Sequence, residues 1–236
     1  MSSVTGGIPS QRQRVEPLAR SKAPLGLRIG FWICIAIAVA VVVRRVLALA
    51  FPVRAAGPQL ALLDSAFASH TALTLAHILP ALVFVVLVPF VLLRAPGNAA
   101  WAERLLFPLG FVVGLTAYAM DIFAIGGWVE RSAVLFFNTW FLFSLARAFV
   151  YRQRSALARE RRWMLRAIVV LLGIATTRPV MGVFFATSRL THLTPNQFFG
   201  IAFWIGFSIN AIVVEIWLRT GDRRLRGREP MRFPAS

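Results

Sequence analysis

Three ionisable side chains, His77, Asp121 and Arg178, lie inside apolar segments that are long enough to cross a membrane. A charged side chain at the centre of a transmembrane helix costs about 2.5–3.5 kcal/mol on insertion scales, so each one requires a partner or a function. An imidazole, a carboxylate and a guanidinium in one place can bind a small anion or a lipid headgroup, or hold a proton. We therefore take these three residues as the candidate site.

The spacing of small residues favours an inward orientation of these side chains. Asp121 shares one helical face with three small residues, Gly110, Gly114 and Ala117. Small residues at this spacing allow another helix to approach, so we expect Asp121 to point into a bundle rather than at lipid. The alternating directions of the helices place all three candidates in the outer half of the bilayer. The alternative is structural: an ion pair between Asp121 and Arg178 locks the helices, and His77 donates to a carbonyl.

Two further polar residues, Asn210 and Glu215, lie on the last apolar segment and are secondary candidates. Glu215 is near the inner end of that segment and close to Arg219, which indicates an ion pair at the membrane boundary. Asn210 lies about 140° around the helix from Glu215, so both side chains cannot face one site without distortion.

Histidine and cysteine positions bear on metal and haem binding. His70, His77 and His192 all fall on the outer half, together with Asp64, but His70 and His77 are about 10 Å apart along a helix. A single metal ion bound by both is therefore not expected, and Cys34 is the only cysteine. Haem between helices usually requires facing axial histidines, and only His77 is well placed. We predict no resident cofactor and keep haem as an alternative.

The composition is that of a membrane protein. Hydrophobic residues make up 58% of the 236 residues, charged residues 15%, and the mean hydropathy is +0.71. A soluble domain has roughly 45–50% apolar and about 25% charged residues, so lipid is the expected solvent here. The formal charge of +17 would suggest nucleic acid in a soluble protein. Here the basic residues flank apolar segments, so we expect anionic lipid headgroups as partners and no nucleic acid.

Six apolar segments predict an all-α, polytopic bundle of six transmembrane helices. Each is long enough, at 1.5 Å per residue, to cross a hydrocarbon layer of roughly 30 Å. The expected helices are residues 29–50, 71–93, 105–125, 132–151, 163–186 and 198–218. Residues 1–28 read as a disordered basic arm and residues 219–236 as a basic tail.

The distribution of basic residues predicts the orientation. If the N-terminus is cytoplasmic, 20 of the 26 Lys and Arg residues fall on the cytoplasmic side and five on the other, with Arg178 inside the membrane. Cytoplasmic loops carry such an excess. We therefore expect a multi-pass protein of the cell inner membrane with both termini in the cytoplasm.

Short motifs in the later segments resemble those of a bacterial membrane family. They are Glu160-Arg161-Arg162-Trp163-Met164, Arg178, Asn210 with Glu215, and His77 followed by Pro89-Phe90. This pattern resembles the family known as domain of unknown function 2306. The resemblance covers about residues 71–219 and implies that the first helix is an addition to the family core.

Two positions depart from that family pattern. The family usually has His where this chain has Glu160, and often a His-Arg pair where this chain has Glu103-Arg104. An activity that used those histidines, such as haem ligation or proton transfer, is thus not implied for this chain. The family itself has no assigned chemistry.

These observations favour a non-enzymatic membrane protein that binds a small anion, a lipid headgroup or a proton at an outward-facing polar site. No GxSxG or GxxxxGK[ST] motif occurs. A haem-bundle-like redox protein and a small-solute transporter are the alternatives. Transport would be supported by broken helices or an internal repeat. Four prolines could break helices, and no repeat is visible.

Overall fold

The computed structural model describes residues 24–51, 64–65, 67–93 and 100–226, and within these ranges it is all-helical, without strands. The helices are α1 (Leu25–Ala50), α3 (Thr71–Leu93), α4 (Ala100–Asp121), α5 (Gly127–Gln153), α6 (Leu157–Leu171), α7 (Gly173–Thr191) and α8 (Pro195–Arg226). Residues 1–23 of the expected arm and residues 227–236 of the expected tail lie outside the described residues. Residues 25–28 belong to α1 and residues 219–226 to α8, so both helices extend further than expected.

Six helical segments are long and apolar enough to cross a membrane, and α6 and α7 together form the fifth. Large apolar side chains such as Trp128 and Leu157 are well exposed on the surface, as expected where lipid is the solvent. The prediction of a polytopic six-helix bundle is confirmed.

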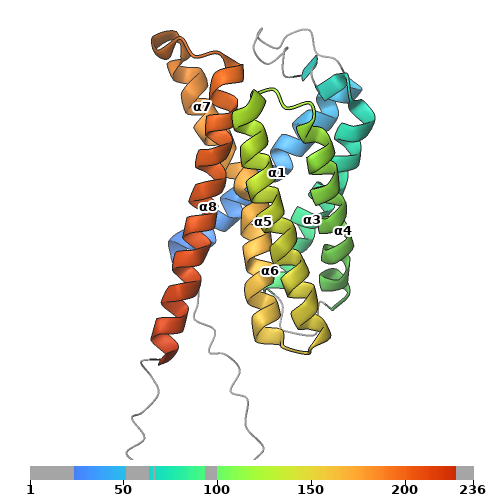
Figure 1. The fold of residues 1–236 in the computed structure, drawn as a ribbon, viewed down its shortest axis with the longest axis vertical. Helices are drawn as coiled ribbons and strands as arrows, with labels where there is room; N and C mark the ends of the chain where they lie inside the picture. The colour runs from blue at the N-terminus through green and yellow to red at the C-terminus, as the bar shows by residue number, and fades with distance from the viewer. Residues whose placement is uncertain (1–23, 52–63, 66, 94–99, 227–236) are drawn as a thin grey trace, which may run out of the picture.

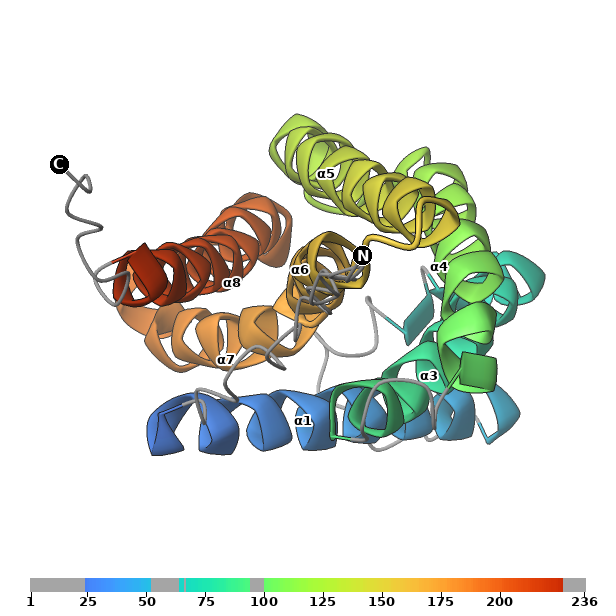
Figure 2. The same ribbon diagram turned by 90° about the horizontal axis from the view of Figure 1, so that it is seen from below.

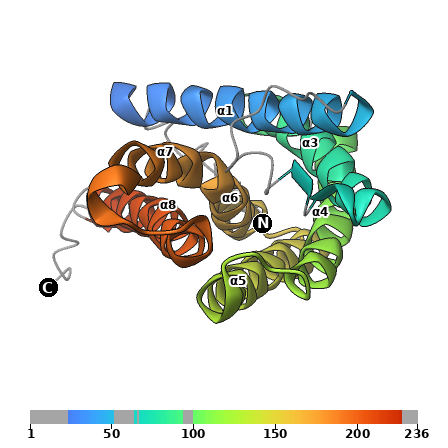
Figure 3. The ribbon, with the colours of Figure 1, turned by 90° about the horizontal axis from the view of Figure 1, so that it is seen from above.

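The helices surround α6, which lies at the centre of the bundle when it is viewed from either end (Figures 2 and 3). Helix α6 packs on α5, and α7 packs on α8. Helix α1 runs diagonally across the side of the bundle, against α3 and α7 (Figure 1). The core between the helices is filled by completely buried side chains such as Phe84, Leu106 and Ile168.

The fifth span differs from the expected continuous helix over 163–186, because Leu172 separates α6 from α7. At this break the Val169 carbonyl accepts a hydrogen bond from Asn210 Nδ2 at 2.9 Å, across from α8. A side chain that enters the helical hydrogen-bond ladder is a recognised cause of a kink. Gly173 adds a close contact, because a Cβ there would lie 2.5 Å from the Phe207 ring.

The third span also ends earlier than expected, at Asp121 rather than at residue 125. The apolar sequence continues through Ile125, but Gly126 and Gly127 introduce a turn before α5. Gly127 has a φ of +60°, which glycine adopts without steric penalty. Gly126 packs so tightly that a Cβ there would lie 2.8 Å from the backbone nitrogen of Gly200. Asp121 is thus the last residue of its helix rather than four residues from its end.

Candidate ligand site

A cavity of about 250 Å³ lies between the helices of the bundle. Its walls come from all the helices, and most of its lining is apolar. His77, Asp121 and Arg178 all line this cavity, from α3, α4 and α7 respectively. The three residues that the sequence singles out therefore line one cavity.

Arg178 reaches the cavity from α7, one turn after Ala175, which lines it too. Its Nη1 donates to the sulfur of Met181 at 3.8 Å, and its Nε is buried without a hydrogen-bond partner. In the part of the chain that the structure describes, no carboxylate lies within ion-pair distance of this guanidinium. A buried cation without a counter-ion is unfavourable. The expected alternative, an Asp121–Arg178 ion pair that locks the helices, is therefore not formed.

The buried carboxylate of Asp121 likewise lacks a polar partner for one of its oxygens in the described chain. Its side chain is buried, and within the described ranges its Oδ1 has no hydrogen-bond partner. It also stands at the C-terminus of α4, where the helix dipole disfavours a negative charge. The nearby Arg131 donates through Nη2 to the Ile122 carbonyl at 2.7 Å rather than to this carboxylate.

His77 is held in one orientation by Thr116 of α4. The Thr116 hydroxyl lies 3.0 Å from His77 Nδ1 and donates its own hydrogen to the Val112 carbonyl at 2.7 Å. Because a hydroxyl has one hydrogen, its oxygen must accept from Nδ1–H, which leaves Nε2 of the neutral imidazole as an acceptor. His77 therefore donates to the Thr116 hydroxyl, and the Val113 carbonyl is a second acceptor for the ring, as the structural alternative expected.

Glu130 and Arg45 also line the cavity, and sequence reasoning did not select them. Glu130 is buried in the first turn of α5, and its Oε2 accepts the Gly126 backbone N–H at 2.6 Å. It precedes the apolar segment expected from residue 132, so the hydropathy pattern does not place it in a helix. An acidic residue soon after Gly-Gly could have been recognised as belonging to the first turn of a helix, where negative charge is favourable.

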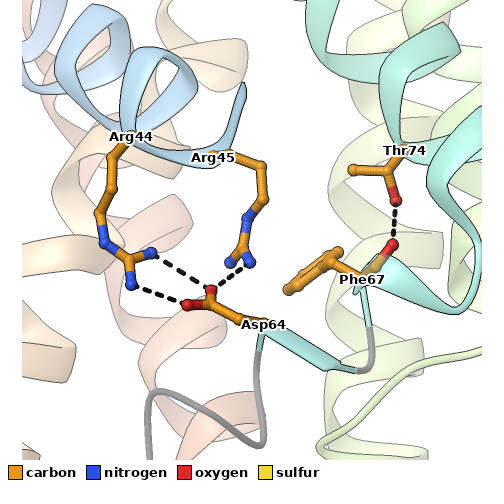
Figure 4. A network of polar contacts seen from close by, with 5 residues as sticks. All are labelled: Arg44, Arg45, Asp64, Phe67 and Thr74. Atoms are coloured by element: carbon orange, nitrogen blue, oxygen red, sulfur yellow. Dashed lines mark hydrogen bonds and ion pairs between the residues drawn. The ribbon is translucent and has the colours of Figure 1, made fainter. Parts of the chain in front are cut away.

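Arg45 belongs to a polar network beside the cavity, shown in Figure 4. Its Nη1 contacts Asp64 Oδ1 at 2.5 Å, and Arg44 Nη2 contacts Asp64 Oδ2 at 3.1 Å (Figure 4). The Arg45 guanidinium also lies 4.1 Å from the centre of the Phe67 ring. The Phe67 carbonyl accepts from Thr74 at 3.1 Å, which ties this segment to α3 (Figure 4).

This network leaves a positive charge next to Arg178. Two guanidinium groups share the single carboxylate of Asp64, and the charges of Arg44 and Arg45 act on Arg178 as well. Glu130 carries the negative charge that acts on Arg178 with the opposite sign. The Arg178 side of the cavity is therefore suited to an anion rather than to a cation.

The two secondary candidates lie outside the cavity lining. Asn210 accepts from the Thr176 hydroxyl at 2.7 Å and donates to the Val169 carbonyl, so it holds α7 and α6 against α8. Glu215 contacts Arg166 Nε at 2.5 Å and Arg219 Nε at 4.0 Å. The expected pairing of Glu215 with Arg219 is present, and Arg166 is the closer partner.

The histidines show no arrangement typical of a metal centre. His70 stacks on Phe123 with ring centres 3.7 Å apart, and it lines the same cavity as His77. Within the described residues, no group of three or more His, Cys, Asp or Glu side chains could hold a metal ion. The expectation that the protein has no resident cofactor, with haem as the alternative, stays a prediction.

Comparison of the chain with protein-family models, with curated proteins and with solved structures gives no match. The resemblance to the family known as domain of unknown function 2306 stays a prediction.

Proposed function

We propose that this protein binds a small amphipathic anion in the cavity between its helices. The acidic group of the ligand contacts Arg178, with Arg45 close by, and its apolar part lies against the Phe199, Phe203 and Phe207 side chains of α8. The observation that carries the proposal is the buried Arg178 guanidinium, which has no carboxylate partner in the described chain and faces an apolar cavity. A ligand anion supplies the missing counter-charge.

The size of the cavity limits the ligand. Ligand pockets are usually about 300–1,000 Å³, and a volume of about 250 Å³ suits a compact molecule or the headgroup end of a lipid. His77 Nε2 and Asp121 Oδ1 are acceptors on the cavity wall, and they receive a hydroxyl or a proton carried by the ligand. This combination favours a short-chain acid or acid phosphate over an inorganic anion alone.

The proposal includes a location. The protein resides in the inner membrane of a bacterial cell with both termini in the cytoplasm, and the cavity lies towards the opposite face. The excess of basic residues at the end with the α5–α6 turn and the end of α8 supports this orientation, because cytoplasmic segments carry such an excess. Anionic headgroups of the cytoplasmic leaflet are partners of those residues.

Transport of the same anion is a second candidate, supported by the interrupted fifth span. Discontinuous helices near the membrane midplane form the binding sites of many secondary transporters. Here the break at Leu172 lies next to the cavity, since Leu171 and Ile174 line it.

Ligand-dependent thermal stability of the purified protein in detergent tests the binding proposal. Octanoate and octyl phosphate should raise the melting temperature, whereas octylammonium should not, because a ligand that binds the folded state stabilises it. Arg178→Gln should abolish the shift. Arg104→Gln, an exposed arginine on α4, is the matched control and should keep it. Equal shifts for the wild type and Arg178→Gln would contradict the proposal.

Arg178→Lys separates charge from geometry. Lysine keeps the positive charge but presents it as a point rather than as a planar fork of donors. A retained shift would assign the interaction to charge alone, and a lost shift would assign it to paired hydrogen bonds from the guanidinium. Flux of the same acid into proteoliposomes distinguishes transport from binding.

A further inference from the structure

Arginines and aromatic rings alternate at the end of the bundle opposite the cavity, on the segments that lead into and out of the α5–α6 turn (bottom of Figure 1). The ring of Tyr151 lies 5.6 Å from the Arg159 guanidinium and 5.1 Å from that of Arg147. The ring of Trp163 lies 5.4 Å from Arg147 and 4.6 Å from Arg166. We call these five residues the Arg–aromatic row.

Two arginines of the row have no acidic partner in the described chain. Glu215 contacts Arg166, and the nearby Glu103 and Glu160 both contact Arg152, which is outside the row. No carboxylate lies within ion-pair distance of Arg147 or Arg159 among the residues described. The Arg147 Nε is buried and lacks a hydrogen-bond partner.

The row lies at a depth that suits a lipid headgroup. Arg147 is on the last part of α5, six residues before Gln153 and thus about 9 Å along the helix axis from its end. Its Nη2 donates to the Tyr151 hydroxyl at 2.8 Å, so the side chain extends towards the end of the helix. Tyr and Trp are enriched at this level of a membrane, where one part of the ring is apolar and the other wet.

The surface beside the row is apolar. Phe143 packs edge-on against Trp163, with ring centres 5.5 Å apart, and is 47% exposed. Phe149, on the same helix, is 45% exposed. The acyl chains of a lipid would cover these rings while its phosphate remains near the arginines. A free phosphate ion has no apolar part and would leave the rings uncovered.

We infer that Arg147 and Arg159, whose guanidinium groups both lie near the Tyr151 ring, bind the phosphate of an anionic phospholipid. The two guanidinium groups donate hydrogen bonds to phosphate oxygens. Arg166, which is paired with Glu215, marks the boundary of the site next to Trp163. This site is independent of the cavity: its residues are not among those lining the cavity, and it binds a lipid whether or not the cavity holds a ligand.

Native mass spectrometry of the full chain, released from detergent with added lipid, tests the site. Phosphatidylglycerol should remain bound to the wild type and phosphatidylcholine much less. The double variant Arg147→Gln/Arg159→Gln should bind phosphatidylglycerol at least tenfold more weakly. The control Arg104→Gln/Arg154→Gln removes two exposed arginines from the same end and should stay within twofold of the wild type.

Several results would overturn the assignment. Equal loss in the control would show that total charge, rather than the row, retains the lipid. Equal binding of phosphatidylcholine would show that the charge of the headgroup is not read. Displacement of the lipid by millimolar inorganic phosphate would assign the site to the free ion. If the double variant does not fold, Arg159→Gln alone applies the same test, because that side chain is exposed and lies near the Tyr151 ring rather than in the core.

Discussion

Arg178 and Arg166 stand on the two halves of the same membrane span, on either side of the break at Leu172. Arg166 contacts Glu215 and lies 4.6 Å from the Trp163 ring, so its charge is compensated within the protein. Arg178 has a methionine sulfur as its only hydrogen-bond acceptor in the described chain. The comparison separates an arginine whose interactions are complete from one whose interactions are left open to a ligand.

The same contrast holds for the surroundings of the two arginines. Arg178 lines the cavity, whereas Arg166 does not line it and its side chain is 15% exposed. Buried unpaired charges are unfavourable for folding but useful for binding, because a ligand then gains the interaction that the protein lacks. The end of the bundle that contains the cavity should therefore be less stable without a ligand than it would be with an apolar residue in place of Arg178.

The largest effect is expected from Gly200→Ala, which disturbs the contact between α8 and α5 beside the cavity. A Cβ at this position would lie 2.5 Å from the backbone nitrogen of Glu130, so α8 and α5 must separate. Overpacking against backbone should lower the free energy of unfolding by about 3 kcal/mol or more. Gly182→Ala is the control, since nothing lies within 4 Å of its added Cβ. Unfolding in mixed micelles measures both, and equal stabilities would contradict the close contact.

Opposite signs are expected when each of the two arginines is replaced by methionine. Arg178→Met removes an uncompensated buried charge and should raise the free energy of unfolding by about 1–3 kcal/mol while abolishing anion binding. Arg166→Met leaves Glu215 without its nearest partner and should lower stability by about 1–2 kcal/mol. The same micelle titration reports both changes. A loss of stability in both variants would mean that Arg178 is compensated in the empty protein.

The smallest effect is expected from Thr116→Val, which sharpens the assignment of the His77 tautomer. The substitution removes the acceptor of His77 Nδ1–H at nearly unchanged volume, so stability should fall by about 1 kcal/mol. Thr220→Val is the control, because among the described residues that hydroxyl bonds to the Ile216 carbonyl of its own helix. Nitrogen NMR of labelled histidine checks the tautomer directly. Protonation of Nε2 rather than Nδ1 in the wild type would contradict the arrangement.

Much of the fold could be predicted from hydropathy, because lipid requires each crossing segment to satisfy its own backbone and therefore to be a long apolar helix. The break at Leu172 could not, since Val169 to Ile174 is uniformly apolar apart from Gly173. The cause of that break lies in Asn210, which is distant in sequence and acts through a hydrogen bond to the Val169 carbonyl.

The candidate site was predictable to the extent that polar residues are conspicuous within apolar segments. His77, Asp121 and Arg178 stand out for this reason, and all three line the cavity. Glu130 and Arg45 do not stand out, because they fall at the margins of such segments, where charged residues are common. Their position at the cavity depends on where α5 begins and on how α1 crosses the bundle, which are tertiary features.

The division of the fifth span has a mechanical consequence. Helix α6 packs on α5, and α7 packs on α8, so the two halves of the span pack against different helices. A ligand that enlarges the cavity would push on α7 and α8 as one unit. Because Leu172 interrupts the helix between α6 and α7, a displacement of α7 would not be transmitted along a continuous helix to Trp163 on α6 and the proposed lipid site beside it.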